Sequence, residues 1–354
     1  EDYTVFDFNV PHFRVTNGDC DSGSCTRYAY VQTAIDNATA GDTIVLEAGI
    51  YRENIVIDKE LNLRGSTVEY QEWDDFHSTK GTIFTVDNSD GFGTPPVANS
   101  SQAAITVSAD NVNIETLILA NFTHGIYVEG SNDVDISSVA TVRTQVSGIS
   151  IVSSDSVVIS NFHMSGSDIT ETGISIEDSA SSVHLYDAPG QRGFVSSCGI
   201  GISVAGDDVS IDGVEIIHGS DDGIHITATA SDVILANNII HSNGGNGIEV
   251  AGLASGTNQF YGNTIYDNGN TEFRIVSSYN LDIYENTISD SEFGYGIHLT
   301  DGSDNEIYGN TLYASTWLDR SDRTLIYDNE FVNITGGSTT YDNSALIIAS
   351  SNNT

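Results

Sequence analysis

Residues 125–128 read Gly125-Ile126-Tyr127-Val128, and the Gly-Ile pair that opens this stretch recurs along the chain. Its copies lie 23 to 26 residues apart until one doubled gap, which is filled near Arg274-Ile275. The further copies are Gly148-Ile149, Gly173-Ile174, Gly199-Ile200, Gly223-Ile224, Gly247-Ile248 and Gly296-Ile297. An interval this regular is typical of a repeat protein.

A second series of apolar residues keeps the same interval, so each repeat contains at least two short apolar segments. The series runs Val112-Ile114, Val134-Ile136, Val157-Ile159, Val183-Leu185, Val209-Ile211, Val233-Leu235, Leu281-Ile283 and Leu325-Tyr327. In both series apolar and polar residues alternate, as in a β-strand that buries one face. Segments this short gain a common core only by stacking. The sequence therefore predicts an all-β parallel solenoid of about ten coils, roughly 50 Å long.

One early segment carries a resemblance to a known family. It reads Asp42-Thr43-Ile44-Val45-Leu46-Glu47-Ala48-Gly49-Ile50-Tyr51-Arg52-Glu53-Asn54-Ile55, followed by Leu61-Asn62-Leu63-Arg64-Gly65. This segment resembles the opening coil of right-handed parallel β-helix repeat proteins, including those with carbohydrate-binding and sugar-hydrolase repeats. In its coil motifs the chain is also similar to copper-accessory and pectin-active β-helix proteins. The resemblance spans about residues 28 to 348 and implies a right-handed parallel β-helix, without specifying a reaction.

The two ends of the chain differ in character. We expect a strand and cap region over residues 1–40 and a single β-helix domain over 41–350. Apolar residues at helical spacing between 28 and 40 predict a short helix that covers the first coil. The stretch 66–103 breaks the repeat and is predicted to be a long loop. The last apolar strand, 345–348, has no later segment to cover it, so we expect self-association through coil ends or flanks.

The charge balance limits the partners of the chain. Fifty acidic and 11 basic residues give a formal net charge of −39. Nucleic acid is excluded as an expected partner because phosphate binding requires the opposite sign. Anionic glycans are also disfavoured unless calcium or a local basic groove intervenes. No run of 18 apolar residues occurs, so no membrane span is expected.

Cysteines and sequons favour an extracellular or cell-surface location. Cys20 and Cys25 enclose four residues and could close a small disulfide, which would fit an oxidising compartment. Cys198 is then unpaired, and we expect a buried thiol or, alternatively, an intermolecular bond. Sequons that would permit glycosylation occur at Asn37, Asn99, Asn121, Asn333 and Asn352.

The segment from His218 to His225 holds the most reactive combination of residues. It places Asp221 and Asp222 between two histidines at one corner, as acid–base catalysis requires. It resembles the paired aspartates of β-helical polygalacturonases, which also carry Asn-x-Asp upstream, Gly-His-Gly downstream and a later Arg-x-Lys. Here Gly-His-Gly is absent, and the Arg274 segment lacks the lysine, so three of the four parts fail to match. If the chain is an enzyme, we expect Asp221, Asp222, His225 and Arg274 to converge on a cleft.

Two other interpretations of this corner remain open. Clustered carboxylate oxygens suit calcium, and the candidate ligands are Asp207, Asp208, Asp221 and Asp222. The run Ser-Asp-Asp-Gly is also ordinary turn sequence, in which case the corner is only solvated. The remaining histidines show no metal-binding spacing, so no cofactor is expected to be required.

Three further sets of residues have structural interpretations. Asparagines that recur 23 to 25 residues apart should stack at one corner: Asn238, Asn263, Asn286 and Asn310. Tyrosines two positions earlier should stack too, either as packing or as a sugar-binding stripe: Tyr261, Tyr284 and Tyr308. Arginines expected to pair with surplus acids are Arg64, Arg320 and Arg323.

These patterns lead to one preferred hypothesis and one alternative. The preferred hypothesis is a secreted, non-catalytic β-helix that acts as a self-assembling component of a cell surface, filament, sheath or layer. It rests on incomplete catalytic sets, an acidic surface and an uncovered last coil. The alternative is a polysaccharide-active enzyme, such as a lyase, hydrolase or epimerase, or a glycan-binding module.

Overall fold

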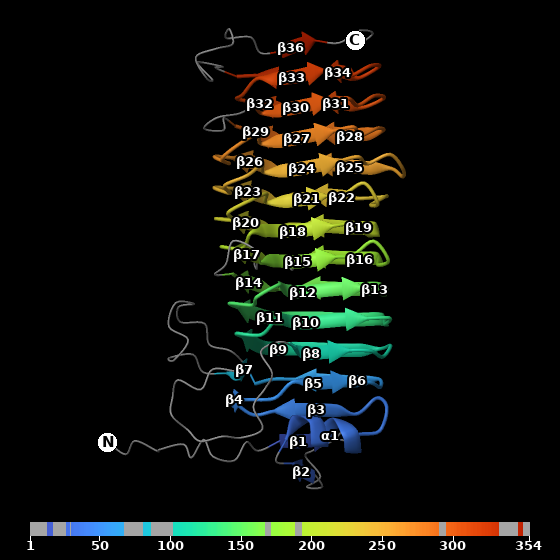
Figure 1. Ribbon diagram of the computed structural model, residues 1–354, viewed down its shortest axis with the longest axis vertical. Coiled ribbons are helices and arrows are strands. Elements are labelled where there is room, and N and C mark those ends of the chain that lie inside the picture. Colours follow the sequence, from blue (N-terminus) through green and yellow to red (C-terminus); the bar gives the residue numbers. More distant parts are fainter. Residues whose placement is uncertain are drawn as a thin grey trace, which may run out of the picture.

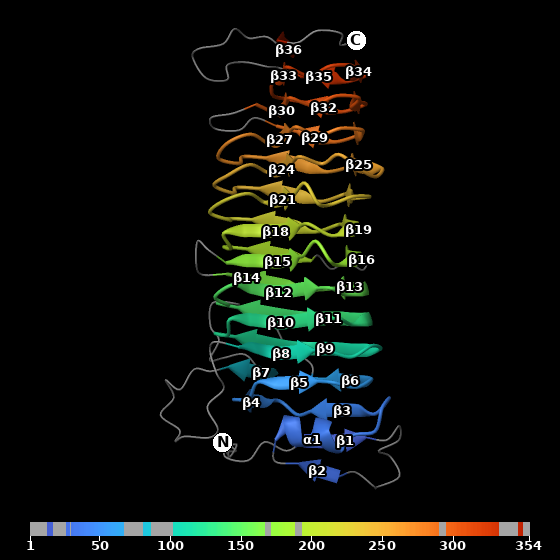
Figure 2. The ribbon, with the colours of Figure 1, turned by 45° about the vertical axis from the view of Figure 1, so that its right-hand side comes forward.

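The computed structural model describes residues 13–16, 26–28, 30–66, 81–85, 102–166, 171–187, 193–289, 295–332 and 346–349. Short strands stack along one axis to form a rod, with one short helix near its N-terminal end (Figure 1). The predicted all-β parallel solenoid is therefore confirmed. Three walls surround the axis, and successive strands pass through wall 1, wall 2 and wall 3 in turn (Figure 2).

Wall 1 is a separate sheet of twelve parallel strands within the described residues. It contains β5 (Ile55–Ile57), β8 (Ala103–Val107), β10 (His124–Glu129), β12 (Ser147–Val152), β15 (Thr172–Ile176), β18 (Ile200–Val204), β21 (Ile224–Ile226), β24 (Ile248–Ala251), β27 (Phe273–Val276), β30 (Ile297–Thr300), β33 (Thr316–Asp319) and β36 (Leu346–Ala349).

Walls 2 and 3 belong to one sheet, because β9 (Val112–Ala120) and β11 (Asn132–Val142) are long enough to run through both. Wall 2 also contains β3 (Thr43–Leu46), β6 (Leu61–Arg64), β13 (Asp155–Ser160), β16 (Ser181–Tyr186), β19 (Asp207–Asp212), β22 (Ile234–Ala236), β25 (Asn258–Tyr261), β28 (Leu281–Tyr284), β31 (Glu306–Tyr308) and β34 (Leu325–Tyr327). Wall 3 also contains β4 (Gly49–Tyr51), β7 (Thr82–Thr85), β14 (His163–Ser165), β17 (Phe194–Ser196), β20 (Glu215–Ile217), β23 (Ile239–His241), β26 (Thr264–Tyr266), β29 (Thr287–Ile288), β32 (Thr311–Leu312) and β35 (Glu330–Phe331).

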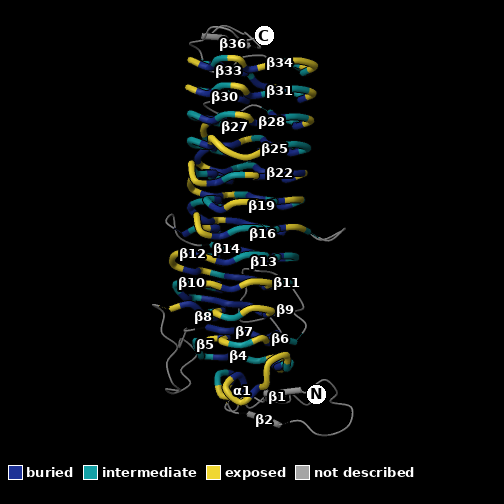
Figure 3. Tube along the Cα trace, turned by 90° about the vertical axis from the view of Figure 1, so that its right-hand side faces the viewer, coloured by how far each residue is buried: buried dark blue, intermediate teal, exposed yellow. Residues whose placement is uncertain are grey.

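Alternation within each strand separates core from surface. In β21, Ile224 and Ile226 are fully buried, whereas His225 between them faces outward. The parallel register sets Ile248 of β24 on Ile224, so buried residues stack on buried residues from coil to coil. Figure 3 shows buried segments recurring along the rod. Full burial of such a side chain contributes about 1.5–3 kcal/mol, so this continuous apolar interior is the main source of stability.

The glycine of the Gly-Ile repeat is required by the close approach of neighbouring coils. A Cβ atom at Gly223 would lie 2.6 Å from the carbonyl oxygen of Gly247. A Cβ atom at Gly201 would lie 2.4 Å from the carbonyl oxygen of Gly223. Only glycine avoids these clashes. The register also shows that Ile202, not Ile200, is the equivalent of Ile224, so the repeat in that coil is Gly201-Ile202.

The corners depend on residues that tolerate a left-handed backbone. One such corner lies at the start of the strands of wall 2, and its residues have φ between 50° and 57°: Asn111, Asp133, Ser156, Ser182, Asp208 and Asp232. Asparagine and aspartate adopt this conformation more readily than most residues, because their short side chains hydrogen-bond to nearby backbone. The abundance of Asn, Asp and Ser between apolar segments therefore follows from corner geometry.

A buried asparagine column joins the coils at the corner between walls 2 and 3. Its members are Asn238, Asn263, Asn286, Asn310 and Asn329. Asn286 is typical: its Nδ2 donates to the carbonyl of Phe260 (2.8 Å) and to Oδ1 of Asn310 (3.0 Å). Its Oδ1 accepts from both nitrogens of Asn263 at 2.9 Å. The predicted asparagine ladder is confirmed, and we call it the asparagine column.

At the N-terminal end, helix α1 (Val31–Asn37) covers the first coil, as the helical spacing predicted. It buries Val31, Ala34 and Ile35. Beside it, β1 (Phe13–Thr16) pairs antiparallel with β3 and with β2 (Thr26–Tyr28). Among the described residues, no helix is both long and apolar enough to cross a membrane.

The predicted loop over 66–103 needs a correction. Residues 82–85 within it form β7, which pairs in parallel with β4 and β9 in wall 3. The apolar sequence Ile83-Phe84 explains this strand, because both side chains are buried in the wall. At the opposite end, β36 pairs with β33. The prediction that no later segment covers this last strand concerns residues 350–354, which lie outside the described part of the chain.

Candidate functional site

The outer face of wall 1 carries a column of chemically diverse side chains in its C-terminal half. Consecutive register pairs align Ser203, His225, Glu249, Arg274, His298 and Trp317. Each alternates with buried core residues, so the strand period turns all of them outward. We call this set the outer column of wall 1. Beside it, at the corner that leads into the wall, lie Asp222, Asn246, Thr271 and Tyr295.

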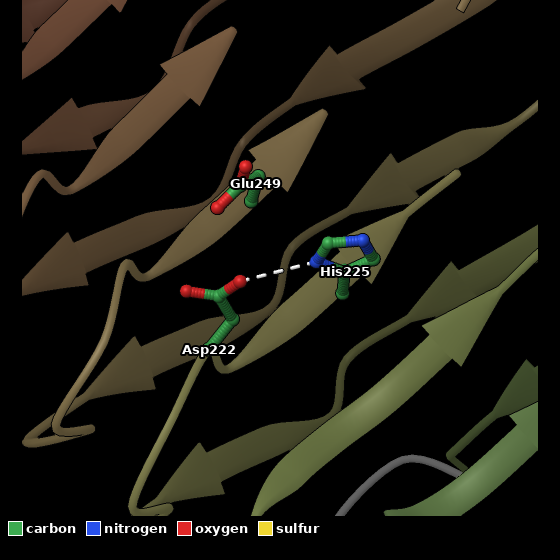
Figure 4. Close-up of side chains that lie close together, drawn as sticks. All are labelled: Asp222, His225 and Glu249. Atoms are coloured by element: carbon green, nitrogen blue, oxygen red, sulfur yellow. Dashed lines mark hydrogen bonds and ion pairs between the residues drawn. The ribbon is translucent and has the colours of Figure 1, made fainter. Parts of the chain in front are cut away.

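Asp222 and His225 form the centre of the candidate site. The Nδ1 atom of His225 lies 3.1 Å from Oδ2 of Asp222. The other oxygen of Asp222 accepts from the backbone nitrogen of Asn246 at 2.7 Å and from its Nδ2 at 2.9 Å. Asp222 is only 4% exposed. Its carboxylate is therefore held in place, and it orients the imidazole ring (Figure 4).

Glu249 approaches the same pair from the next coil. Its Oε2 accepts from Nδ2 of Asn246 at 2.8 Å, and its Oε1 pairs with Nη1 of Arg274 at 2.5 Å. Ligand atoms of Asp222, His225 and Glu249 all lie within 4.8 Å of one another. Figure 4 shows these three side chains gathered at the start of two neighbouring strands. We call them the Asp–His–Glu cluster.

The electrostatics separate the two carboxylates of this cluster. Burial favours the neutral form of Asp222, but hydrogen bonds from His225 and Asn246 outweigh it and lower the pKa. Burial raises the pKa of Glu249, the charge of Asp222 adds to this, and Arg274 opposes it. The hydrogen bond to Asp222 raises the pKa of His225 above 6.5, although burial opposes the shift.

This arrangement suits proton transfer near neutral pH. A histidine oriented by a carboxylate through Nδ1 can exchange protons through Nε2. Within the described part of the chain, Nε2 of His225 makes no hydrogen bond, and 28% of the side chain is exposed. The ring can therefore meet a substrate while Asp222 remains buried behind it.

The cluster is less suited to a resident metal ion. One nitrogen and two carboxylates within 4.8 Å could hold a cation. The N–H groups of Asn246 and the guanidinium of Arg274 already donate to these carboxylates. They compensate the negative charge that would attract a cation.

The structure brings together three of the four residues expected for an enzyme. Asp222 and His225 are in contact, and Arg274 joins them through Glu249. Asp221 is exposed and lies outside the cluster, because adjacent residues at the bend point in different directions. Glu249 was missed by sequence reasoning. It follows Gly247-Ile248 just as His225 follows Gly223-Ile224, so the repeat period would have found it.

The four aspartates predicted to bind calcium do not form one group. Asp207 and Asp208 lie at the start of β19 in wall 2 and accept from Ser231 and Ser182 respectively. Asp222 instead precedes β21 in wall 1. The strand of wall 1 separates these corners, so the structure does not bring the four carboxylates together.

Two aromatic groups lie on the surface. In the outer column, the ring of His298 stacks on Trp317 at 4.7 Å, and Tyr295 meets Trp317 at 4.8 Å and 61°. At the end of wall 2, rings 5.0 Å apart form the predicted stack of Tyr261, Tyr284 and Tyr308, which Tyr327 extends. The faces of the inner tyrosines are covered by one another. This tyrosine column therefore offers ring edges rather than ring faces to a sugar.

The other predicted residues occupy varied positions. Cys198 is a buried free thiol, and burial raises its pKa to about 12. Asn37 is exposed at the end of α1, whereas Nδ2 of Asn121 donates to Thr85. The arginines expected to pair with acids do so: Arg64 with Glu115, Arg320 with Asp301, and Arg323 with Asp304. Cys20, Cys25, Asn99, Asn333 and Asn352 lie outside the described residues.

Comparisons with known proteins agree with the fold. The family model described as "Right handed beta helix region" matches residues 99–265 and 191–354, whereas no curated protein matches the chain. The A-module of the Azotobacter vinelandii mannuronan C-5 epimerase AlgE6 is similar in structure, with a TM-score of 0.56 and 14% identity. That alignment covers 91% of this chain and 92% of the epimerase module.

Two further solved structures are also similar. One is a DFA-IIIase from Arthrobacter chlorophenolicus A6, with a TM-score of 0.55, 14% identity, and coverage of 87% of this chain and 88% of that one. The other is PfbA, a surface adhesin of Streptococcus pneumoniae, with a TM-score of 0.53 and 10% identity. That alignment covers 91% of this chain and 88% of PfbA. At these identities the likeness concerns the fold, including its right hand.

Proposed function

We propose that this chain, which belongs to the family of right-handed β-helix regions, processes a polysaccharide that lies along wall 1. The reaction takes place at the Asp–His–Glu cluster, outside the cell or on its surface. The observation that carries this proposal is the pairing of a buried carboxylate with an outward-facing histidine.

The cluster supplies the step that lyases, hydrolases and epimerases share, which is a proton transfer to or from a sugar. His225 is the proton-transfer group, and Asp222 orients it through Nδ1. Glu249 has a raised pKa and is the second acid–base group, and Arg274 aligns its carboxylate. The pKa values of Asp222 and Glu249 are shifted in opposite directions, which is characteristic of acid–base sites.

The shape of wall 1 favours a polymer over a small molecule. Strands about 4.8 Å apart repeat the same outward position along the rod. From His225 to Trp317 the outer column crosses four strand spacings, or about 19 Å. An extended glycan chain can contact this whole length. The names of two similar structures, an epimerase and a DFA-IIIase, agree with a catalytic role on this fold.

A non-catalytic structural role is the second candidate. The asparagine and tyrosine columns stiffen the rod, which suits an assembled surface layer, and PfbA is a surface adhesin by name. A structural role of this kind does not explain the Asp–His–Glu cluster. Electron microscopy at several protein concentrations, with and without calcium, would show fibres or sheets if this candidate is correct and single rods if it is not.

A polysaccharide screen tests the proposed function. The wild-type protein is incubated with neutral and acidic polysaccharides, and products are followed by reducing ends, ultraviolet absorbance of unsaturated sugars and proton NMR. We expect one of these signals with at least one polymer, and its loss in Asp222→Asn. Binding without any product would support a glycan-binding module instead. Equal turnover by wild type and Asp222→Asn would overturn the site assignment.

A further inference from the structure

Asn246 bridges the two carboxylates of the candidate site. Its Nδ2 donates to Asp222 Oδ1 at 2.9 Å and to Glu249 Oε2 at 2.8 Å. Its backbone nitrogen also donates to Asp222 Oδ1 at 2.7 Å. Its own Oδ1 accepts from the backbone nitrogen of Thr271 at 3.2 Å. With 5% exposure, this side chain is enclosed by three consecutive coils.

A primary amide is the group that fits these contacts. Its two N–H bonds can be shared between two carboxylates, while its oxygen accepts from the third coil. An aspartic acid at this position would offer one proton at most and could not serve both acids. A serine would be too short to reach both. Without these donors, Asp222 and Glu249 would face each other with less compensation of their charges.

We propose that Asn246 is the positioning residue of the site: by bridging Asp222 and Glu249, it keeps Asp222 turned toward Nδ1 of His225. The consequence concerns the tautomer of the imidazole. An ionised Asp222 that accepts from Nδ1 holds the neutral ring in the Nδ1-protonated form and leaves Nε2 as the base. This role rests on the proposed function, because it assigns Nε2 to the substrate.

The surroundings of His225 show why Asn246 is needed. Asp222 faces the ring from the preceding corner, and Glu249 faces it from β24. Ser203 lies in register with it on β18, and the charges of Asp221 and Glu249 also act on it. Asp222 is hydrogen-bonded to the ring, whereas Glu249 and Asp221 act on it only through their charges. The bridge made by Asn246 selects Asp222 as the partner of Nδ1.

Nitrogen-15 NMR of the substrate-free protein tests this role. The imidazole nitrogens are observed at a pH above the pKa of His225, and His225→Gln identifies the signals. We expect the Nδ1-protonated tautomer in the wild type. In Asn246→Ser, and in the isosteric Asn246→Asp, we expect the Nε2-protonated tautomer to predominate, because Asp222 keeps the backbone donor of residue 246 but loses the side-chain donor that turns it toward Nδ1.

Asn270 provides a matched control. It is an exposed asparagine at the same corner, one coil further on, and its side chain makes no hydrogen bond to the cluster among the described residues. Asn270→Ser and Asn270→Asp should leave the tautomer of His225 unchanged. A wild-type tautomer in folded Asn246→Asp or Asn246→Ser protein would overturn the proposal.

Activity gives a second readout that a purely structural role would not produce. On a polysaccharide that the wild type converts, folded Asn246→Ser should lose on the order of 10²-fold in kcat, with KM little changed. A loss of thermal stability that accompanies the loss in kcat, with the tautomer retained, would show a structural role only. The NMR result stands whether or not the screen finds a substrate, so the two proposals fail separately.

Discussion

The asparagine column and the outer column of wall 1 follow the same coil period but differ in chemistry. The asparagine column repeats one residue type over five coils and lies in the interior between walls 2 and 3. The outer column changes at each coil, from serine to histidine, glutamate, arginine, histidine and tryptophan. One column repeats a contact, and the other gathers different functional groups.

The difference shows how a repeat fold separates stability from function. In the asparagine column each amide satisfies the next, so every member needs the same neighbour above and below it. In the outer column the backbone alone fixes the spacing, and the outward side chains are free to vary. Identical polar residues at the coil period thus indicate structure, whereas unlike polar residues at that period indicate a site.

Breaking the asparagine column should have the largest effect on stability. Asn286→Ala leaves the Phe260 carbonyl and the Asn263 N–H buried without partners. Each of these two groups costs about 1–3 kcal/mol, so we expect a loss of about 2–6 kcal/mol in the free energy of unfolding, measured by urea denaturation. Exposed Asn270→Ala is the control and should cost less than about 1 kcal/mol. Similar losses in both variants would contradict the structural role of the column.

Changing the outer column should affect activity instead. Glu249→Gln keeps the size of the side chain but removes its charge and its acid–base capacity. We expect turnover of an identified polysaccharide to fall on the order of 10²-fold or more, with a stability change below about 1 kcal/mol. Glu306→Gln, on the outward face of wall 2, should retain wild-type turnover. Loss of stability without loss of turnover in Glu249→Gln would reverse the assignment.

The tyrosine column sharpens the comparison, because it repeats like the asparagines but lies at the surface. Tyr284→Ala removes stacking contacts with Tyr261 and Tyr308. At about 0.5–1.5 kcal/mol for each of the two pairs, we expect a loss of about 1–3 kcal/mol in unfolding free energy. Binding to a polysaccharide, measured by calorimetry, should be unchanged. Abolished glycan binding would identify this column as the sugar-binding surface.

The smallest effect concerns pH. Because the folded state raises the pKa of His225, its ion pair with Asp222 contributes stability that is fully present below about pH 6.5. This contribution is lost as the pH rises through the raised pKa. The stability difference between wild type and His225→Gln should therefore shrink as the pH increases from 6 to 9. A difference that grows over this range would mean that the pKa is lowered in the folded state.

Most of the fold could be predicted from the sequence, because its signals are periodic. The Gly-Ile repeat follows from coil contact at positions such as Gly223, and alternation marks the strands. Asn263 and Asn286 repeat at the same interval and stack as expected. The prediction was wrong by two residues at Ile202, where Ile200 had been assigned to the repeat. It also omitted β7, which interrupts the irregular stretch 66–103.

The candidate site was only partly predictable. Asp222 and His225 lie close together in sequence and were named with Arg274. Glu249 and Asn246 were not predicted, because they reach the site from the next coil and are not neighbours of Asp222 and His225 in the sequence. Adding one period of 24 residues to Asp222 and His225 leads to Asn246 and Glu249. The exact contacts depend on the geometry of the corner, where Asp222 turns inward and Asp221 turns outward.

The central claim is that His225 performs chemistry on a glycan at wall 1. The most direct measurement compares turnover of the identified polysaccharide by wild type, His225→Gln and His184→Gln. His184 is also a half-buried histidine whose Nδ1 is hydrogen-bonded, to Ser210 at 2.7 Å, but it lies on wall 2. We predict that His225→Gln loses at least about 10²-fold in kcat and that His184→Gln retains wild-type turnover. Full turnover by folded His225→Gln would contradict the account.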